Sequence, residues 1–270
     1  MTPVPPLSLD DLALVASGSG FSRVIGPDWT FADRVFGGCT AALALTAARA
    51  RSAHPHALSA HVIFLEAAQP GAVQLDVTEL RSGRNTWVGR VVATQAGRSV
   101  LTCDVWFGDR GASGRDPVLA EPGAVPAPEH CPALSWLPEM WPCMGFLEER
   151  AIDYPADPDE RHGGRHVALW ARPIKDIGPD PFLAQVLDLM FADAHLMDAA
   201  LRGTGLRDTI GFSLDISVVW ERPAPSPGWL RLTASAESAD DGFVTCHGTV
   251  RGPDGRLRAT ALTQGRSLGR

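Results

Sequence analysis

The sequence contains very little lysine: Lys175 is the only one among 270 residues, and the formal net charge is -7. No run of basic residues occurs either. A general nucleic-acid-binding protein presents a basic surface to the phosphates, so these absences argue against that class. Any anionic ligand would have to be met by a few local arginines.

Long hydrophobic runs are absent too. No window reaches the roughly 18 consecutive apolar residues of a membrane helix, and the start of the chain shows no basic segment followed by an apolar one. These absences predict a cytoplasmic protein without a membrane partner. The five cysteines are scattered and form no CxxC pair, so we expect reduced thiols, no zinc site and no other metal or organic cofactor.

What the sequence does contain is an internal repeat. With 45% hydrophobic and 20% charged residues, its composition suits one large globular domain or two fused small ones. Segments 59–106 and 213–264 align with few gaps, and Pro70-Gly71 then meets Pro227-Gly228. A duplicated unit of one helix and several strands is therefore predicted.

The two copies differ at two polar positions. In the alignment Asp215 stands opposite Ser59, and Gln264 stands opposite Trp106. An active site on an otherwise symmetric scaffold would leave such an asymmetry. Asp215 and Gln264 are therefore the first candidates for a functional site.

The first copy begins with an apolar segment, residues 35–48, that contains no charged side chain. A helix that is apolar all round must be buried on all sides. Residues 73–77 and 101–107 alternate apolar and polar side chains, which is typical of strands with one covered face. Turn residues at 81–85 and 95–98 separate the strands, so an antiparallel meander is predicted.

The second copy shows the same kinds of element. A helix is expected over residues 181–201, because Asp180 before Pro181 is a helix-start signal. The strands expected around this helix are residues 144–154, 166–172 and 230–236.

The segment between the copies has a different composition. Residues 108–132 are rich in glycine, proline, aspartate and alanine and show no periodicity, as is typical of a linker. We therefore expect an N-terminal unit over residues 1–108, a linker over 109–136 and a C-terminal unit over 137–270.

Several short motifs narrow the fold further. They are Val35-Phe36-Gly37-Gly38, Ser59-Ala60-His61 leading into Phe64-Leu65, Leu214-Asp215 leading to Trp220-Glu221-Arg222-Pro223, and Asp254-Gly255 with Gln264-Gly265. In this order and spacing they resemble the acyl-CoA thioesterase II family. The resemblance implies an α+β double hotdog, in which each of two tandem units has a long buried helix wrapped by an antiparallel sheet. It also implies a thioester hydrolase acting on acyl-CoA, and the exposed sheet edges and faces of such units predict a homodimer.

The resemblance also assigns roles. In this family an Asp, a Gln and a Ser or Thr hold one water against the thioester carbonyl. Asp215 matches the aspartate and would accept the proton, whereas Gln264 matches the glutamine and would orient the water. Glu237 occupies the third position, and the nearest hydroxyl is that of Ser238. A one-residue step along a strand reverses the face of a side chain, so Ser238 can substitute only if a bulge turns it inward.

Glu237 leaves several interpretations open. A second carboxylate beside Asp215 would raise one pKa, and the pair could serve as a base at neutral pH. Glu237 could instead be a solvated turn residue, or it could mark a site that has lost its reaction. The last case supplies an alternative function, a catalytically degenerate acyl-CoA binding protein of the same fold.

The candidate substrate-binding residues lie mainly at the start of the first helix. Gly37, Gly38 and Cys39 offer backbone N–H groups to the oxyanion, and glycine permits a close approach. A thiol at a helix start could be a nucleophile, but no histidine or acid is linked to Cys39 by the sequence, so packing is the better interpretation. His61 belongs to the family pattern and is the histidine best placed for a hydratase of this fold. No matching Asp/His motif appears, however, and a core or interface role suits His61 better.

Two further sets of charged residues are singled out. Asp188 interrupts an apolar helix, and it either faces an acyl pocket or lies on a solvent-facing stripe with Gln185 and His195. The phosphates of a coenzyme A tail need cationic partners. The arginines expected to supply them are Arg84, Arg90, Arg165, Arg172 and Arg222.

Overall fold

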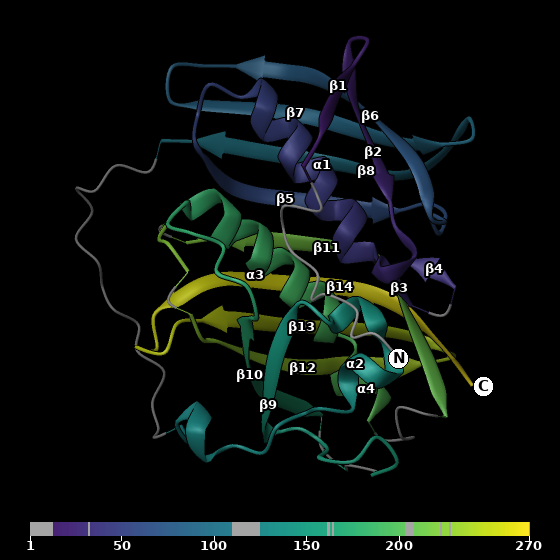
Figure 1. Ribbon diagram of the computed structural model, residues 1–270, viewed down its shortest axis with the longest axis vertical. Coiled ribbons are helices and arrows are strands. Elements are labelled where there is room, and N and C mark those ends of the chain that lie inside the picture. The colour runs from purple at the N-terminus through teal and green to yellow at the C-terminus, as the bar shows by residue number, and fades with distance from the viewer. Residues whose placement is uncertain are drawn as a thin grey trace.

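A computed structural model describes residues 13–31, 33–109, 125–160, 163, 165–202, 208–221, 223–226 and 228–269. Within them, twelve strands form one antiparallel sheet. Two long helices, α1 (Gly37–Arg51) and α3 (Pro181–His195), pack against each other on one face of this sheet (Figure 1).

The remaining elements complete this arrangement. The short helices are α2 (Leu137–Met140) and α4 (Asp198–Leu201), and a separate two-stranded sheet is formed by β3 (Thr30–Phe31) and β4 (Arg34–Val35). In spatial order, the strands of the large sheet are β1 (Val15–Ser17), β2 (Gly20–Ile25), β6 (Gly71–Ser82), β7 (Thr86–Gln95), β8 (Arg98–Gly108), β5 (His56–Phe64), β11 (Thr209–Trp220), β14 (Leu257–Gly269), β13 (Phe243–Arg251), β12 (Leu230–Asp240), β10 (His166–Pro173) and β9 (Leu147–Asp153).

The strand order confirms the internal repeat. The order β2, β6, β7, β8, β5 in one half is mirrored by β10, β12, β13, β14, β11 in the other, and β5 pairs with β11 in the middle. Ser59 pairs with Trp106 and Asp215 pairs with Gln264, as the alignment of the two copies requires. In both copies a one-residue register shift directly precedes this pair. The double hotdog prediction is therefore confirmed.

Helix α1 is buried as its sequence predicts. Ten of its residues are buried, and they face both α3 and the sheet. Its many alanines keep the helix narrow, so both neighbours can approach closely. Leu43 and Leu45 are fully buried, and each contributes about 1.5–3 kcal/mol relative to an exposed leucine.

Helix α3 starts where it was predicted but ends earlier. Asp180 is its N-cap and accepts a hydrogen bond from the Phe182 N–H at 2.9 Å, with Pro181 in the first turn. The single helix expected over 181–201 is in fact two, because α3 ends at His195 and α4 begins at Asp198. No glycine or proline marks this break, which coincides with a hydrogen bond between the His195 and Asp198 side chains.

The expected solvent-facing stripe on this helix is wrong. Asp188, Gln185 and His195 are 1%, 2% and 0% exposed, because the sheet and α1 cover the helix. Each polar side chain has a buried partner instead. The Gln185 amide accepts from the Ala57 N–H at 3.0 Å and donates to the Ala57 carbonyl at 2.7 Å. It thereby joins the helix of the second unit to a strand of the first.

The unit boundaries at residues 108 and 136 stay a prediction. Residues 110–124 of the expected linker lie outside the described residues. Ala133 forms a β-bridge with Arg150, and the Leu134 N–H donates to the Glu149 carbonyl at 2.9 Å. The last residues of the expected linker therefore pack with the second unit.

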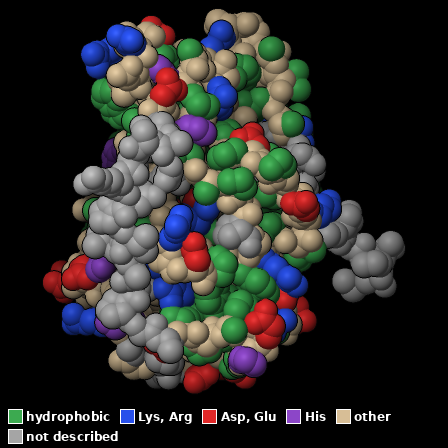
Figure 2. All heavy atoms as spheres, turned by 90° about the vertical axis from the view of Figure 1, so that its left-hand side faces the viewer, with side chains coloured by type: hydrophobic (Ala, Val, Ile, Leu, Met, Phe, Trp, Pro, Cys, Tyr) green, Lys and Arg blue, Asp and Glu red, His purple; other side chains and the backbone are tan. Residues whose placement is uncertain are grey.

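The surface carries charges of both signs. On the side that Figure 2 shows, basic and acidic side chains are interspersed, with hydrophobic side chains between them. No broad region of one sign covers the described part of that side. Within the described ranges, no helix is long and apolar enough to cross a membrane.

Candidate active site

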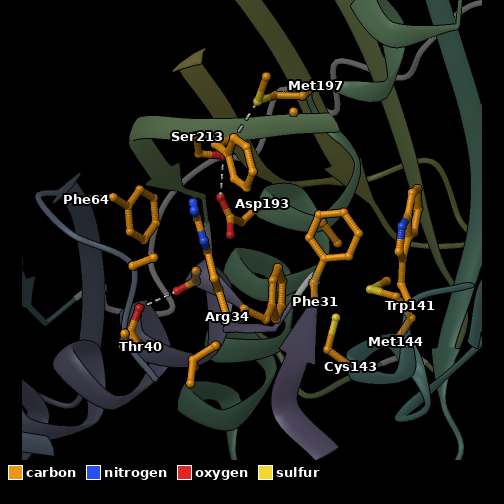
Figure 3. Close-up of a pocket in the computed structure, with 18 of the residues that line it drawn as sticks. Phe31, Arg34, Thr40, Phe64, Trp141, Cys143, Met144, Asp193, Met197 and Ser213 are labelled. Carbon is orange, nitrogen blue, oxygen red and sulfur yellow. Dashed lines mark hydrogen bonds between the residues drawn. The ribbon is translucent and has the colours of Figure 1, made fainter. Parts of the chain in front are cut away.

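A cavity of about 240 Å³ lies between the start of α1 and the end of α3 (Figure 3). Its walls are formed by residues of β3 and β4, by Phe64 at the end of β5 with the segment 65–68 that follows, by residues 141, 143 and 144, and by the start of β11. Most lining side chains are apolar, and the charged side chains that line it are those of Arg34, Glu66, Asp193 and Asp198. Residues of both units therefore line the cavity, and charged side chains lie among its apolar walls.

Asp193, on the last turn of α3, is the central polar residue of this cavity. Its Oδ1 accepts a hydrogen bond from the Ser213 hydroxyl at 2.9 Å, and its carboxylate also accepts the Gly38 N–H. Burial raises its pKa from 3.8 to about 6, although both hydrogen bonds lower it. Asp193 is thus mostly ionised at neutral pH and still close to its own pKa, as a general base requires.

The start of α1 explains why this carboxylate lies there. Phe36 occupies the N-cap position and offers no capping side chain, so Asp193 supplies the acceptor from the other helix. A Cβ on Gly37 would lie 3.0 Å from Asp193 Oδ2 and 3.1 Å from the Phe64 ring. Glycine at this position therefore makes room for both groups.

A cluster of charged residues adjoins the cavity at Asp198. His195 Nε2 is 2.5 Å from Glu149 Oε1, and its Nδ1 is 3.1 Å from Asp198 Oδ2. The Tyr154 hydroxyl donates to the same Asp198 oxygen. Despite the opposing effect of burial, the two carboxylates raise the pKa of His195 to about 10. His195 is therefore an imidazolium that holds α3, α4 and β9 together.

Because of this cluster, the free energy of unfolding should decrease at alkaline pH. The folded-state pKa of His195, about 10, lies above its ordinary value of 6.5, so its contribution is complete below about pH 6.5 and is lost as the pH rises through about 10. We expect the free energy of unfolding, measured with urea, to fall over that interval. A His195→Gln variant should show a flatter profile. An equally steep decline in the variant would contradict this assignment.

Asp215 and Gln264 are brought together, but outside the cavity. Their strand neighbours Ile216 and Thr263 are fully buried on the helix-facing side, so the alternation of side chains places Asp215 and Gln264 on the opposite face of the sheet. Asp215 Oδ1 accepts the backbone N–H of Gln264 at 3.0 Å, and the Gln264 side chain is exposed. The prediction that these two residues hold the catalytic water stays a prediction.

Glu237 and Ser238 lie on a bulge, as the sequence allowed. A register shift falls between Ala236 and Ser238, so Glu237 is the extra residue. Both side chains are exposed, and Glu237 is 3.0 Å from His247 Nδ1. Two strands separate β12 from β11, so of the interpretations left open for Glu237, the carboxylate pair with Asp215 is not formed.

Of the candidate substrate-binding residues, Gly37 and Gly38 contact the cavity or its Asp193 carboxylate, whereas Cys39 and His61 do not. Gly37 lines the cavity, and the Gly38 N–H is held by Asp193. Cys39 is fully buried, and burial raises the pKa of its thiol far above the ordinary range, so it is a packing residue and not a nucleophile. Its N–H donates to the Phe36 carbonyl at 3.0 Å. His61 lies on the outer sheet face, where its Nδ1 is 2.7 Å from the Ser217 hydroxyl oxygen.

Two of the arginines expected to contact phosphates are already paired. Arg90 binds Asp104 through two hydrogen bonds of 2.6 Å, and Arg172 binds Glu148. Arg84 and Arg165 are exposed. Arg222 lies outside the described residues.

Sequence reasoning missed Asp193 and Ser213. Asp193 is an isolated acid near the end of an apolar helix, and its importance depends on the start of α1, far away in the sequence. Ser213 lies two residues before Asp215, and the intervening register shift places it on the cavity side. The one available signal was the missing N-cap side chain before Gly37. In the part of the chain that the structure describes, no group of His, Cys, Asp and Glu is arranged to hold a metal.

Comparisons with known proteins support this reading of the fold. Residues 25–108 match the family model of the acyl-CoA thioesterase N-terminal domain, and residues 128–265 match that of the C-terminal domain. A candidate thioesterase of Novosphingobium aromaticivorans is 30% identical, with a TM-score of 0.77, and the match covers 94% of this chain and 98% of the other.

Two mycobacterial proteins are also similar. The acyl-CoA thioesterase II TesB2 of Mycobacterium marinum shares 22% identity with a TM-score of 0.76, over 97% of this chain and 98% of the other, and so shares the fold. An uncharacterized protein of Mycobacterium tuberculosis is 28% identical over 264 residues, covering 84% of each chain. With both family models matched in tandem, the chain belongs to the acyl-CoA thioesterase family.

Proposed function

We propose that this chain hydrolyses acyl-CoA thioesters in the cavity between α1 and α3, with Asp193 as the general base. The observation that carries the proposal is the partly buried Asp193 carboxylate, held at the N-terminus of α1 by the Gly38 N–H and the Ser213 hydroxyl. A carboxylate in this position can take a proton from a water that attacks the thioester carbonyl.

The N-terminus of α1 provides partial positive charge for the negative charge that develops on the thioester oxygen. Attack of water on the carbonyl carbon produces an oxyanion, which free N–H groups at a helix N-terminus stabilise. Of the three N–H groups proposed from the sequence, that of Gly37 is the best candidate, because those of Gly38 and Cys39 have partners within the protein. Collapse of the intermediate releases the coenzyme A thiolate and the acid. Ser213 keeps the Asp193 carboxylate oriented throughout.

The pair Asp215 and Gln264 remains the second hypothesis for water activation. The resemblance to the family favours it, and the adjacent pairing of the two residues is compatible with it. Their position on the outer sheet face disfavours it, because a substrate there would lie on an open surface. Glu237 and Ser238 would belong to the same outer-face site, since Ser238 pairs with Thr245, which in turn pairs with Gln264.

Thiol release from short, medium and long acyl-CoA thioesters tests both the function and the choice between these sites. We expect release by the wild type and by Asp215→Asn at rates within about threefold, because the Asp215 carboxylate binds backbone and does not face the cavity. Gln264→Ala serves as the matched second variant on the same face. A loss of turnover of about a hundredfold or more in Asp215→Asn, with the fold intact, would favour the sheet-face site instead.

Binding of acyl-CoA without any thiol release would support the alternative, a catalytically degenerate binding protein. The homodimer also stays a prediction. The outer sheet face exposes Ile63, Trp106, Val219 and Leu262, which are 39%, 39%, 47% and 45% exposed. A second copy of the chain would find its apolar contact surface there.

A further inference from the structure

The cavity combines a small size with an unusual share of aromatic side chains. Its volume of about 240 Å³ lies below the roughly 300–1,000 Å³ that is usual for small-molecule sites. Five of its 23 lining residues are aromatic, namely Phe31, Phe36, Phe64, Trp141 and Phe212, whereas aromatic residues make up 7% of the whole chain. The space is thus too small to enclose a long alkyl chain, and rings form much of its wall beside the charged side chains of Arg34, Glu66, Asp193 and Asp198.

The aromatic wall begins directly beside the proposed base. The Asp193 carboxylate and the edge of the Phe64 ring are 3.0 Å and 3.1 Å from the same point, the position a Gly37 Cβ would take. A thioester carbonyl next to Asp193 therefore places the adjoining carbons of its acyl group against Phe64. The Phe36 ring lies on Gly38 in the same way, where it fills the place of a Cβ.

The far wall is made of aromatic rings that pack against one another. Phe31 and Trp141 (Figure 3) meet edge to face with ring centroids 5.5 Å apart. Trp136 in turn packs edge-on against Trp141 with ring centroids 6.1 Å apart. Met144 and Met197 add two thioether groups to the lining, and sulfur makes favourable contacts with aromatic rings. Rings held in this way prefer a flat ring in edge or offset contact to a flexible chain of the same volume.

We propose that the acyl group of the preferred substrate is a short aryl or arylalkyl group, and not a long linear chain. The proposal rests on the proposed function, since it assumes that the acyl group occupies this cavity. In the bound substrate, the thioester carbonyl would lie at Asp193, and a spacer of one carbon or none would pass Phe64. The ring of the acyl group would then lie between Phe31, Trp141 and the two methionines, Met144 and Met197.

Thiol release from four thioesters tests it: benzoyl-CoA, phenylacetyl-CoA, hexanoyl-CoA and palmitoyl-CoA. We expect the faster of the two aryl thioesters to have a kcat/KM roughly tenfold above that of hexanoyl-CoA, because each added ring contact is worth a factor of about two to ten. Palmitoyl-CoA should be slower than hexanoyl-CoA. Hexanoyl-CoA at least as fast as both aryl thioesters, or palmitoyl-CoA fastest of all, would overturn the proposal. Release from none of the four would contradict the proposed function itself.

Variants of the wall give a second readout. Trp141→Leu and Phe31→Leu should each lower the ratio of aryl to hexanoyl kcat/KM toward one, because the edge-to-face partners are lost. A ratio within one preparation does not depend on how much of the variant is folded, so reduced stability cannot mimic this result. Leu80→Ala, on an exposed bulge of β6, is the matched control and should keep the wild-type ratio. An unchanged ratio in both wall variants would overturn the proposal.

Discussion

Replacing Asp193 with asparagine should lower kcat for thiol release by about a hundredfold to ten-thousandfold, the usual contribution of a positioned general base. Asparagine keeps one acceptor oxygen, which can take the Gly38 N–H, and its NH2 group can donate to the Ser213 hydroxyl oxygen, so the geometry should survive. It cannot take a proton from water. Steady-state kinetics with the fastest thioester substrate measure this effect.

The same variant should be at least as stable as the wild type at neutral pH. The folded-state pKa of Asp193, about 6, lies above its ordinary value of 3.8, so ionisation opposes folding, and stability is lost as the pH rises from about 3.8 through 6. Asparagine removes this cost, which is about 1–3 kcal/mol at pH 7. Urea unfolding followed by tryptophan fluorescence measures it. A variant that loses both activity and stability would point to a structural role for Asp193.

The second large effect is expected at Asp188. Its carboxylate is 1% exposed and accepts two hydrogen bonds from Arg258, at 3.0 Å from Nε and 3.2 Å from Nη2. Asp188→Ala leaves a buried guanidinium without its counter-charge and should lower the free energy of unfolding by about 3–5 kcal/mol. Neither residue lines the cavity, so the folded fraction should keep the wild-type KM. Equilibrium unfolding in urea is the measurement.

A double variant separates the charge effect from packing. Asp188→Leu combined with Arg258→Met removes both charges and keeps the volume, so it should recover most of the loss. The Arg258 guanidinium also donates to the carbonyls of Ala224 and Pro225, and those two acceptors would lose their donor. A loss below about 1 kcal/mol in Asp188→Ala would show that water or these carbonyls suffice for Arg258.

The fold was largely predictable, because it depends on patterns that repeat. The charge-free segment 35–48 could only be a buried helix, and the alignment of Ser59 with Asp215 gave the strand register that the structure has. The end of α3 was not predictable. Its last residue, His195, belongs to a buried ion cluster, and that cluster includes Glu149, which is remote in sequence.

The site was less predictable than the fold, since it depends on which face each side chain takes. A single register shift between Ser213 and Asp215 turns Ser213 toward the cavity and Asp215 away from it. A motif match in the sequence does not reveal such a shift. Asp193 has no motif at all, and it becomes important only because the end of α3 lies beside the start of α1 in the folded chain.

The pH dependence of kcat/KM tests the central claim, that ionised Asp193 is the base, most directly. We expect the wild type to gain activity with increasing pH along a limb of unit slope with an apparent pKa of about 6. Asp193→Asn should lack this limb in its residual activity. A wild-type profile that is flat through that region, or a limb that persists unchanged in Asp193→Asn, would contradict the account.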